Sequence, residues 1–323
     1  MNKKFFYILV FVVIMLLTGC GGKSKDVFSE NPSFPPPDGS SLIGYDGRIY
    51  VSKELATAIN GIDSFDAEKR YVIAYDGDTY EYTYTAALES GAEVLTVEAA
   101  NNEITVRTSL FFVFSITEDA DYFYITLAGP RTKYAKIVMI DPGHGGDDPG
   151  AEYGGVTEKD INLEIAKLLF KMFENGNSGI KAYMTRYGDD FVYRADRPAV
   201  SNAAADLFIS IHCDSYPDDT SVGGTSTYYP SDAASNVGRL KAASREIAGM
   251  VQDDVSAALG TRNRGIIANS ELVVLKDAKI PAILVEVAFL TNDGERAMLQ
   301  DGDELEKAAA AMYGAIVRAL GGK

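Results

Sequence analysis

Short runs of apolar residues, broken by turn residues, fill the stretch from residue 41 to residue 133. The runs RIYVS, RYVIAY, TYEYTY, EITVRT, FFVFSI and YFYITL are rich in β-branched and aromatic residues, which favour strands. One segment, KELATAING at 53–61, has the spacing of a short helix that stops at Gly61. The pattern therefore predicts a small β-rich domain over residues 41–133, whose role it does not reveal.

From residue 134 to residue 323 apolar runs alternate with longer amphipathic segments. The expected strands are KIVMID, IKAYMTR, DLFISIH, GGTSTYYP, ELVVL and AILVEVAF. The expected helices are KDINLEIAKLLFKMF, FVYRADRPAVSNAAA, VGRLKAASREIAGMVQDDVSAALG and a last one over about 294–320. This alternation predicts an α/β fold, with a mixed central sheet and helices on both faces. In such sheets, sites lie beyond the carboxyl ends of the strands.

Residues 1–20 belong to neither pattern. A short basic start, MNKK, is followed by the apolar run FFYILVFVVIMLL and then by LTGC, an order typical of a secretory signal. LTGC resembles the lipobox of bacterial lipoprotein precursors, in which the cysteine, here Cys20, becomes lipidated. The alternative is a plain membrane anchor, although the run is short beside the roughly 20 residues of a full span.

Residues 21–40 are rich in Gly, Ser and Pro and show no apolar period, which predicts a flexible tether. With lipid on Cys20, the tether would hold an exported protein on the outer side of the cytoplasmic membrane, facing the cell wall. Only Cys213 would then remain, so we expect no disulfide within the chain.

The charge balance narrows the range of partners. The chain has 46 acidic and 30 basic residues and a formal net charge of −16. Binding to nucleic acid requires clustered Lys and Arg, so we expect no nucleic-acid partner. The same acidity disfavours a second, electrostatic contact with the membrane.

The chain contains only two histidines, and each follows an apolar run. His144 comes after KIVMID in a loop with three glycines, which permit the positive φ angles of a tight turn. His212 ends the run LFISI. Because side chains alternate along a strand, Ser210, His212 and Asp214 share one face, whereas Cys213 faces the other way and is expected to be a small buried residue.

Two glutamates complete the candidate chemistry. Glu158 begins the helix KDINLEIAKLL, where Thr157 and Asp160 resemble a capping box; it either complements the helix dipole or acts as a ligand. Two imidazoles and one carboxylate form a known ligand set of catalytic zinc. Glu286 lies among apolar residues in AILVEVAF, where an unpaired charge is costly. Glu286 is therefore either a general base or the partner of a buried arginine, and spacing does not separate these roles.

The motifs IDPGHGG…PGA, TEKDINL, ADLFISIH and PAILVEVAFL, in this order, resemble the zinc-dependent N-acetylmuramoyl-L-alanine amidases of the amidase-3 family over about residues 136–320. The resemblance implies that His144, Glu158 and His212 bind one Zn²⁺ per chain and that Glu286 is catalytic. It further implies a peptidoglycan substrate, cleaved at the amide between N-acetylmuramic acid and L-alanine. Two details depart from the family pattern: Ala288 stands where glycine is more usual, and HCD stands where HAN or HAD is commoner.

Several alternatives stay open at this stage. Arg264, in the motif NRG, either binds a carboxylate of the stem peptide or forms a surface ion pair. The protein could instead be another zinc peptidase acting on cell-wall peptides, or a non-catalytic wall-binding lipoprotein. The sequence identifies no activating protein partner. In the first domain, YDGRIYVSKELATAING loosely resembles the copper-amine-oxidase-like N-terminal domains of secreted bacterial proteins.

Overall fold

A computed structural model describes residues 48–54, 56–65, 70–78, 82–87, 93–108, 111–231, 238–269 and 271–322. The chain divides into two compact units, one ending at Lys133 and the other beginning at Tyr134. The expected signal, the tether and Cys20 lie outside the described residues, so they stay predictions. Across the described ranges, none of the helices combines the length and the apolar character needed to span a membrane.

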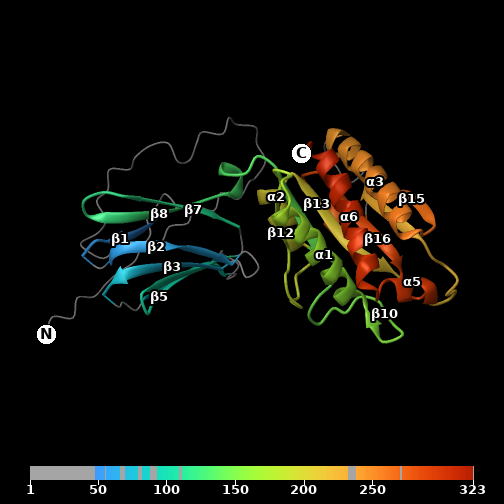
Figure 1. Cartoon of the computed structure of the whole chain (residues 1–323), viewed down its shortest axis with the longest axis horizontal. Helices are drawn as coiled ribbons and strands as arrows, with labels where there is room; N and C mark the ends of the chain where they lie inside the picture. The colour runs from blue at the N-terminus through green and yellow to red at the C-terminus, as the bar shows by residue number, and fades with distance from the viewer. Residues whose placement is uncertain are drawn as a thin grey trace. The chain divides into compact units, whose positions relative to one another are not determined.

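The described part of the first unit consists of two antiparallel sheets (Figure 1). The smaller sheet has the order β1 (Arg48–Ser52), β8 (Tyr122–Ala128), β7 (Val113–Glu118). The larger sheet has the order β2 (Ala56–Phe65), β3 (Arg70–Gly77), β6 (Glu103–Thr108), β5 (Glu93–Ala100), β4 (Tyr82–Ala87). A 3₁₀ turn, Pro130–Thr132, follows the last strand.

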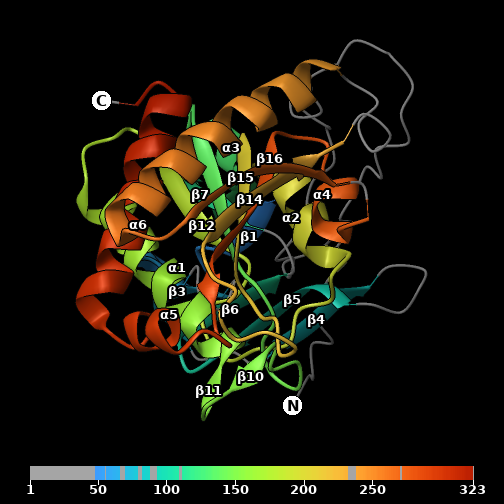
Figure 2. The same cartoon turned by 90° about the vertical axis from the view of Figure 1, so that its right-hand side faces the viewer.

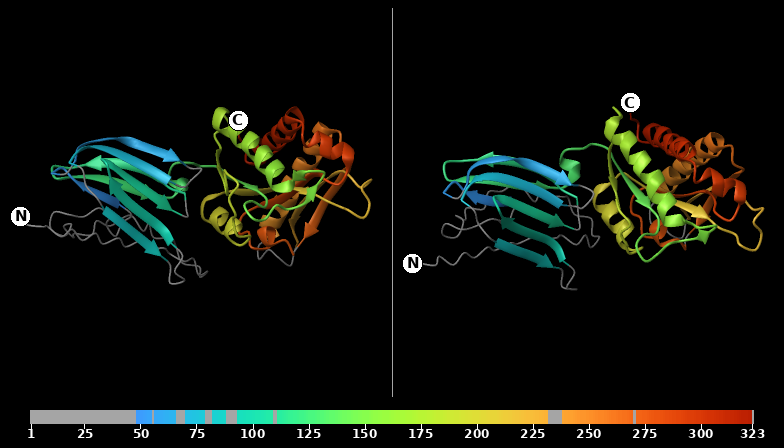
Figure 3. Two further views of the ribbon diagram at one scale, coloured as in Figure 1. Left: turned by 90° about the horizontal axis from the view of Figure 1, so that it is seen from below. Right: turned by 60° about the horizontal axis from the view of Figure 1, so that its bottom comes forward.

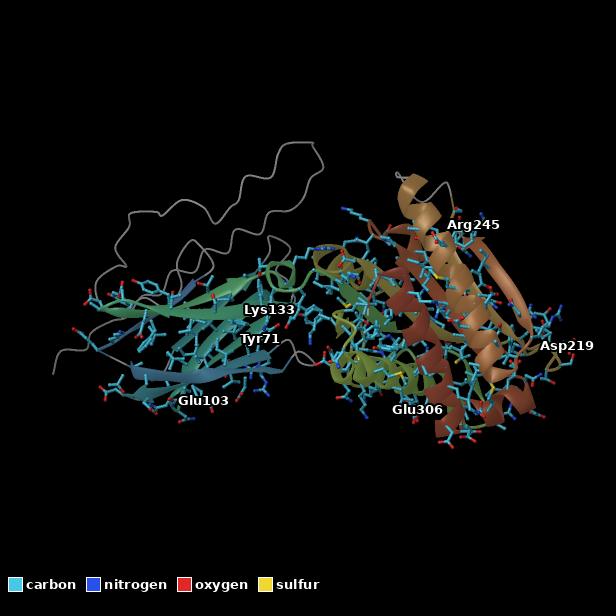
Figure 4. All side chains as sticks on the ribbon, turned by 45° about the horizontal axis from the view of Figure 1, so that its top comes forward. Tyr71, Glu103, Lys133, Asp219, Arg245 and Glu306 are labelled. Atoms are coloured by element: carbon cyan, nitrogen blue, oxygen red, sulfur yellow. The ribbon has the colours of Figure 1, made fainter. Side chains whose placement is uncertain are left out.

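The two sheets of this unit share one hydrophobic core. Every second residue of β3 is buried in it, namely Tyr71 (labelled in Figure 4), Ile73 and Tyr75. Ile125 and Leu127 of β8 lie in the same core. This period of two is the one that a half-buried strand requires. The aromatic residues Tyr71 and Tyr75 therefore belong to the core rather than to a sugar-binding face.

One element of this unit differs from the prediction. Residues 53–61 were expected to form a helix, but from Ala56 onward they belong to β2, which pairs antiparallel with β3. An isolated helix of nine residues is only marginally stable, whereas β2 gains ladder hydrogen bonds along its length by pairing with β3. The ladder accommodates Gly61, with a φ of 141°, through a register shift between Ile59 and Gly61. The predicted helix was wrong.

The second unit is built on a six-stranded mixed sheet. Its order is β12 (Lys181–Met184), β9 (Ile137–Pro142), β13 (Leu207–Asp214), β16 (Ala282–Phe289), β14 (Thr225–Pro230), β15 (Asn263–Asn269). The first four strands are parallel, β14 runs antiparallel to β16, and β15 runs parallel to β14. A small hairpin, β10 (Glu152–Tyr153) and β11 (Val156–Thr157), lies between β9 and the first helix.

Helices cover both faces of this sheet. The helices α1 (Glu158–Asn175), α3 (Gly238–Leu259) and α6 (Gly302–Ala319) pack side by side over one face (Figures 1 and 3). The helices α2 (Asp196–Ala204) and α4 (Val273–Lys276) contact each other on the other face (Figure 2). A short helix, α5 (Asp293–Met298), follows β16. The predicted α/β class, with a mixed sheet between helices, is confirmed.

Some boundaries of this unit differ from the sequence pattern. The run ELVVL, expected to be a strand, contains α4, and the strand next to β14 is instead β15, which the pattern did not predict. The expected last helix is two helices. Asn292 caps α5, since its Oδ1 accepts from the N–H groups of Gly294 and Glu295, and Asp301 caps α6 by accepting from the N–H of Asp303. Each of these side chains begins a new helix, so the segment forms α5 and α6 rather than one continuous helix.

Candidate metal centre and active site

His144 lies in a tight loop that begins where β9 ends. Its φ of 60° is in the left-handed region, which is uncommon for residues other than glycine, and Gly145 and Gly146 also have positive φ. Gly143 permits a close approach, because a Cβ atom at this position would lie 2.2 Å from Cε1 of His212. The glycines therefore let the loop bring the two imidazoles together. The sequence predicted this freedom for the glycines but not the left-handed conformation of His144 itself.

Two buried arginines hold this loop by its carbonyl oxygens. Arg197 donates to the carbonyls of Pro142 (2.8 Å) and His144 (2.7 Å). Arg186 donates to the carbonyls of Pro142 (3.0 Å) and Gly143 (2.8 Å). The sequence assigned no role to either arginine, because contacts to backbone oxygens leave no trace in residue spacing.

Asp141, the last residue but one of β9, anchors this arrangement. It is fully buried and accepts hydrogen bonds from Arg197 Nη1 (2.7 Å), Thr185 Oγ1 (2.6 Å) and Ser210 Oγ (2.7 Å). Burial raises the pKa of Asp141, but Arg197 and the two hydroxyls outweigh this effect and hold it below its ordinary value. The ionised carboxylate thus ties together the ends of β9, β12 and β13.

Glu158 is the first residue of α1, and its carboxylate lies between the two histidines. Oε2 lies 3.1 Å from Nε2 of His144 and accepts from the N–H of Ala151 (2.9 Å). Oε1 lies 2.8 Å from Nδ1 of His212 and accepts from the N–H of Cys213 (3.2 Å). Burial raises the pKa of Glu158, but the two imidazoles outweigh it and hold the pKa far below its usual range. Glu158 therefore does more than complement the helix dipole.

The start of α1 differs in detail from the capping box that the sequence suggested. Thr157 occupies the N-cap position, but its side chain bonds the carboxylate of Asp160 and makes no bond to a backbone N–H. Asn162, one turn into the helix, donates to the carbonyl of Gly143 (3.4 Å) and to Glu158 Oε1 (3.3 Å). Asn162 thereby links the helix to the loop of β9.

His212 ends the apolar part of β13, as the sequence predicted. Its ring centroid lies 4.9 Å from that of His144, and the two rings are nearly perpendicular. Cys213 is buried in the core on the opposite side of the strand, in agreement with the alternation of side chains. His144 Nδ1 lies 2.9 Å from Asp148 Oδ1, although the angles there are not those of a hydrogen bond.

The residues His144, Glu158 and His212 fit a zinc ion. One potential ligand atom of each can be chosen so that all three lie within 4.8 Å of one another. The histidine-to-carboxylate distances of 3.1 and 2.8 Å are close to the separation of about 3.3 Å between ligands of a tetrahedral zinc. Two imidazoles and one carboxylate match the donor set of catalytic zinc and leave a fourth position open.

Glu286 lies directly beside this cluster. In the ladder of β13 and β16 it pairs with His212, so both side chains point from the same face of the sheet. Its Oε2 atom is inaccessible to solvent and has no hydrogen-bond partner among the described residues. Burial, followed by the charges of Glu158 and Asp214, raises the pKa of Glu286 well above its ordinary value. In the described part of the chain no buried arginine pairs with it.

Arg264, at the start of β15, is exposed and borders a pocket of about 440 Å³. Its Nη1 donates to the carbonyl of Gly223 (3.2 Å), and its guanidinium lies over the ring of Phe289 at 5.0 Å from the centroid. Burial raises the pKa of the nearby Asp214, and the positive charge of Arg264 partly offsets this rise. Arg264 thus lies close enough to Asp214, two residues after His212, for their charges to interact.

Comparison with known proteins covers this second unit. The family model Amidase_3, described as N-acetylmuramoyl-L-alanine amidase, matches residues 138–318. The N-acetylmuramoyl-L-alanine amidase LytC of Bacillus subtilis (strain 168) is 36% identical over 179 residues, which are 55% of this chain and 34% of that protein. The chain therefore spans about a third of the length of this relative. The resemblance of the first unit to copper-amine-oxidase-like domains receives no support from these matches.

Two solved structures share the fold of the second unit. An N-acetylmuramoyl-L-alanine amidase from Clostridium difficile 630 aligns with a TM-score of 0.53 and 31% identity, over 58% of this chain and 97% of that one. The CwlD amidase from Clostridioides difficile, solved in complex with the GerS lipoprotein, aligns with a TM-score of 0.51 and 32% identity, over 58% of this chain and 98% of that one.

Proposed function

Because this chain belongs to the N-acetylmuramoyl-L-alanine amidase family, we propose that it hydrolyses the amide between N-acetylmuramic acid and the L-alanine of the peptidoglycan stem peptide. The convergence of His144, Glu158 and His212 beside Glu286 is the observation that carries this proposal. The family description gives the class of bond, and the cluster gives the groups that would act on it.

The proposed cofactor is one Zn²⁺, held by an imidazole nitrogen of His144, a carboxylate oxygen of Glu158 and an imidazole nitrogen of His212. Zinc in such a site polarises the substrate carbonyl and lowers the pKa of water to about 7. The chain itself fixes the position of two of these ligands: Arg197 and Arg186 hold the His144 loop, and backbone N–H groups orient the Glu158 carboxylate.

Glu286 is the proposed general base and acid. Its unpartnered Oε2 atom is free to accept a proton from the attacking water and to deliver that proton to the nitrogen of the departing L-alanine. A cation bound to the neighbouring ligands would favour the carboxylate form, since the raised pKa of Glu286 comes from burial and from nearby acids.

The test of this function is mass spectrometry of the products that the zinc-loaded chain forms from a defined muramyl peptide. Release of the intact stem peptide with a free L-alanine amine is the expected result. A Glu286→Gln variant should lose activity by a factor of about 10² to 10⁴ while keeping its zinc. Glu306→Gln, the same change at an exposed position of α6, serves as the matched control.

Other outcomes would point elsewhere. Cleavage within the stem peptide would identify a different zinc peptidase that uses the same ligand set. Zinc-loaded protein that binds the muramyl peptide without cleaving any bond would favour a wall-binding role.

We further propose that the protein works while held to the outer side of the cytoplasmic membrane by lipid on Cys20. The support is the order of basic start, apolar run and LTGC in residues 1–20. Expression of a Cys20→Ser variant in a bacterial host should move the protein from the membrane fraction to the soluble fraction. Retention of the variant at the membrane would instead favour an uncleaved apolar anchor.

A further inference from the structure

The candidate metal ligands lie in the middle of one edge of the sheet, and different side chains flank them on the two sides. The order of the strands is β12, β9, β13, β16, β14, β15, with His144 after β9 and His212 at the end of β13. The segment after β12 carries two exposed aromatic residues. The start of β15 carries two arginines, Arg262 just before the strand and Arg264 within it.

The arginine side is the pocket of about 440 Å³ bordered by Arg264, which we call the arginine pocket. It is lined by Asp219, Ser221, Val222, Gly223, Arg262, Arg264, Asn292 and Glu295. Its two acids are engaged locally. Glu295 Oε2 accepts from the N–H of Phe289 (2.7 Å), and Asp219 Oδ1 accepts from the N–H of Ser221 (2.9 Å).

Most N–H donors of the two arginines in this pocket make no hydrogen bond with the described residues. Arg264 uses one nitrogen for the carbonyl of Gly223, and the Arg262 side chain makes no hydrogen bond or ion pair with the described residues. Each guanidinium has five N–H donors in a planar fork that matches a carboxylate. The two positive charges are balanced by Asp219 and Glu295, so the feature that fits a small carboxylate ligand is the set of N–H donors that the two guanidinium groups leave unused.

The other side holds Phe191 and Tyr193, which we call the aromatic pair. Their rings are 5.0 Å apart in an edge-to-face arrangement, and the two residues are 49% and 68% exposed. The backbone between them is held to the loop of His144, one of the candidate metal ligands, by a shared arginine. Arg197 donates to the carbonyl of Val192 (3.2 Å) as well as to that of His144 (2.7 Å). Exposed rings in a fixed position beside an active site are suited to packing against the apolar C–H face of a sugar.

We propose that the substrate lies along this edge in one direction, with its muramic acid sugar on the aromatic pair and a free carboxylate of its stem peptide in the arginine pocket. This orientation rests on the proposed function, because the amide to be cleaved has the sugar on its acyl side and the peptide on its amine side. Once the carboxylate occupies the arginine pocket, the sugar must extend toward β9 and β12.

The dimensions agree with this direction. Neighbouring strands are about 4.8 Å apart, so the start of β15 is roughly 14 Å from the end of β13. The side chain of Arg264 shortens this distance because it lies back over Phe289 of β16. An extended peptide advances roughly 3.5 Å per residue, which brings a carboxylate on the second stem residue near the pocket.

Three probes test the orientation: N-acetylmuramoyl-L-alanyl-D-glutamate, its amide N-acetylmuramoyl-L-alanyl-D-isoglutamine, and N-acetyl-L-alanyl-D-glutamate, which lacks the muramic acid sugar. Binding to the zinc-loaded full chain is measured by calorimetry in the Glu286→Gln background, so that no probe is consumed. Wild-type chain is assayed in parallel for cleavage of the same probes.

The two sides should respond to different changes in the probe. Arg262→Gln combined with Arg264→Gln should weaken binding of the acid roughly tenfold or more and leave binding of the amide nearly unchanged. Tyr193→Ala should remove most of the affinity gained from the muramic acid sugar and leave the acid-to-amide ratio unchanged. Arg245→Gln, the same type of substitution at one exposed position of α3, away from Asp219 of the pocket (Figure 4), is the control and should change neither value.

The opposite pattern, in which the arginine variant alters the sugar effect and Tyr193→Ala alters the acid-to-amide ratio, would reverse the orientation. Unchanged affinities in both variants, with cleavage by wild type intact, would refute the two subsites and leave the amidase function standing. Failure of wild type to cleave any probe would count against the proposed function instead. Arg262→Gln alone changes an exposed side chain, so it should leave the fold intact. Weaker binding of the acid by this variant therefore reflects a lost contact rather than unfolding.

Discussion

At the scale of single residues, two glycines make room for the cluster of candidate ligands. A Cβ atom on Gly143 would lie 2.2 Å from Cε1 of His212. A Cβ atom on Gly150 would lie 2.5 Å from Glu158 Oε2 and 2.7 Å from His144 Cδ2. Real Cβ atoms do not approach other atoms so closely, so the imidazoles and the carboxylate meet only because these positions lack side chains.

We therefore predict that Gly143→Ala displaces His212 and lowers the affinity for zinc at least tenfold. A tenfold loss of affinity is the lower end of the effect expected when a metal ligand is no longer held in position. The fold of the second unit should persist, because the methyl group meets a side chain rather than the core. Zinc content after dialysis and the circular dichroism spectrum would check both points. Gly249→Ala, in α3 with open space around it, is the control and should keep zinc affinity unchanged.

Because the pKa of the buried Asp141 carboxylate is lowered, we expect the stability of the fold to depend on pH. Its pKa in the folded chain is below the value of about 3.9 for an unfolded chain. Its contribution to the free energy of unfolding is therefore fully present above pH about 4 and is lost as the pH falls through the folded pKa. Asp141→Asn should lower stability at pH 7 and flatten the loss of stability below about pH 4. Urea unfolding at several pH values would measure this, and an unchanged slope in the variant would contradict the assignment.

The candidate site was predictable from the sequence only where a residue interrupts a pattern. His144, His212 and Glu286 stand out because each ends or breaks an apolar run, and Glu158 because it opens a helix. The supporting residues Asp141 and Arg186 give no such signal. Their partners are up to 69 positions away in the sequence, and many of those partners are backbone oxygens.

At the scale of elements, Arg197 joins the loop after β9 to the segment before α2. Its side chain, on α2, donates to Asp141 and to the carbonyls of Pro142, His144 and Val192. A lysine would keep the charge but lose the planar fork that reaches several acceptors at once.

Arg197→Lys should therefore lower the free energy of unfolding by at least about 2 kcal/mol, the value of one hydrogen bond to a charged group. The same variant should bind zinc less tightly, since His144 loses a constraint on its carbonyl. Urea unfolding and zinc titration are the measurements. Arg318→Lys, at an exposed ion pair with Asp254, should stay within about 0.5 kcal/mol of wild type. Equal effects of the two substitutions would exclude the proposed constraint.

Strands with a strong hydrophobic pattern were predictable from the sequence, whereas strands that form only through pairing with a neighbouring strand were not. The apolar runs of β9, β13 and β16 are long and flanked by turn residues, and each forms a strand. The segment that becomes β2 has alanines and a glycine compatible with either state, and its partner β3 decides the outcome. β15 contains the polar sequence NRGIIAN, and only its parallel pairing with β14 makes it a strand.

At the scale of the whole molecule, each unit has its own hydrophobic core. The core of the first unit is formed by residues of its two sheets, and that of the second by the mixed sheet and the helices α1, α3 and α6. All four residues of the candidate active site belong to the second unit. A compact unit with its own core is able to fold alone.

We predict that residues 134–323, produced alone, unfold in one cooperative transition and cleave a soluble muramyl peptide as fast as the full chain does. Calorimetry should show this transition again in the full chain, beside a second one from the first unit. A fragment that aggregates, or that is stable but inactive, would show that the first unit contributes to folding or to the active site. Intact cell walls as substrate would then reveal whether the first unit aids access.

The two buried arginines recognise the loops around the site almost entirely through main-chain carbonyl oxygens. Every amino acid offers the same oxygen, so a mutation that replaces a loop side chain leaves these contacts in place. Evolution can accordingly rewrite the outer surface of the loops while the reacting groups keep their positions. An enzyme whose cell-wall substrate varies in composition benefits from this separation. Its specificity can change through the loop side chains while the catalytic residues keep their arrangement.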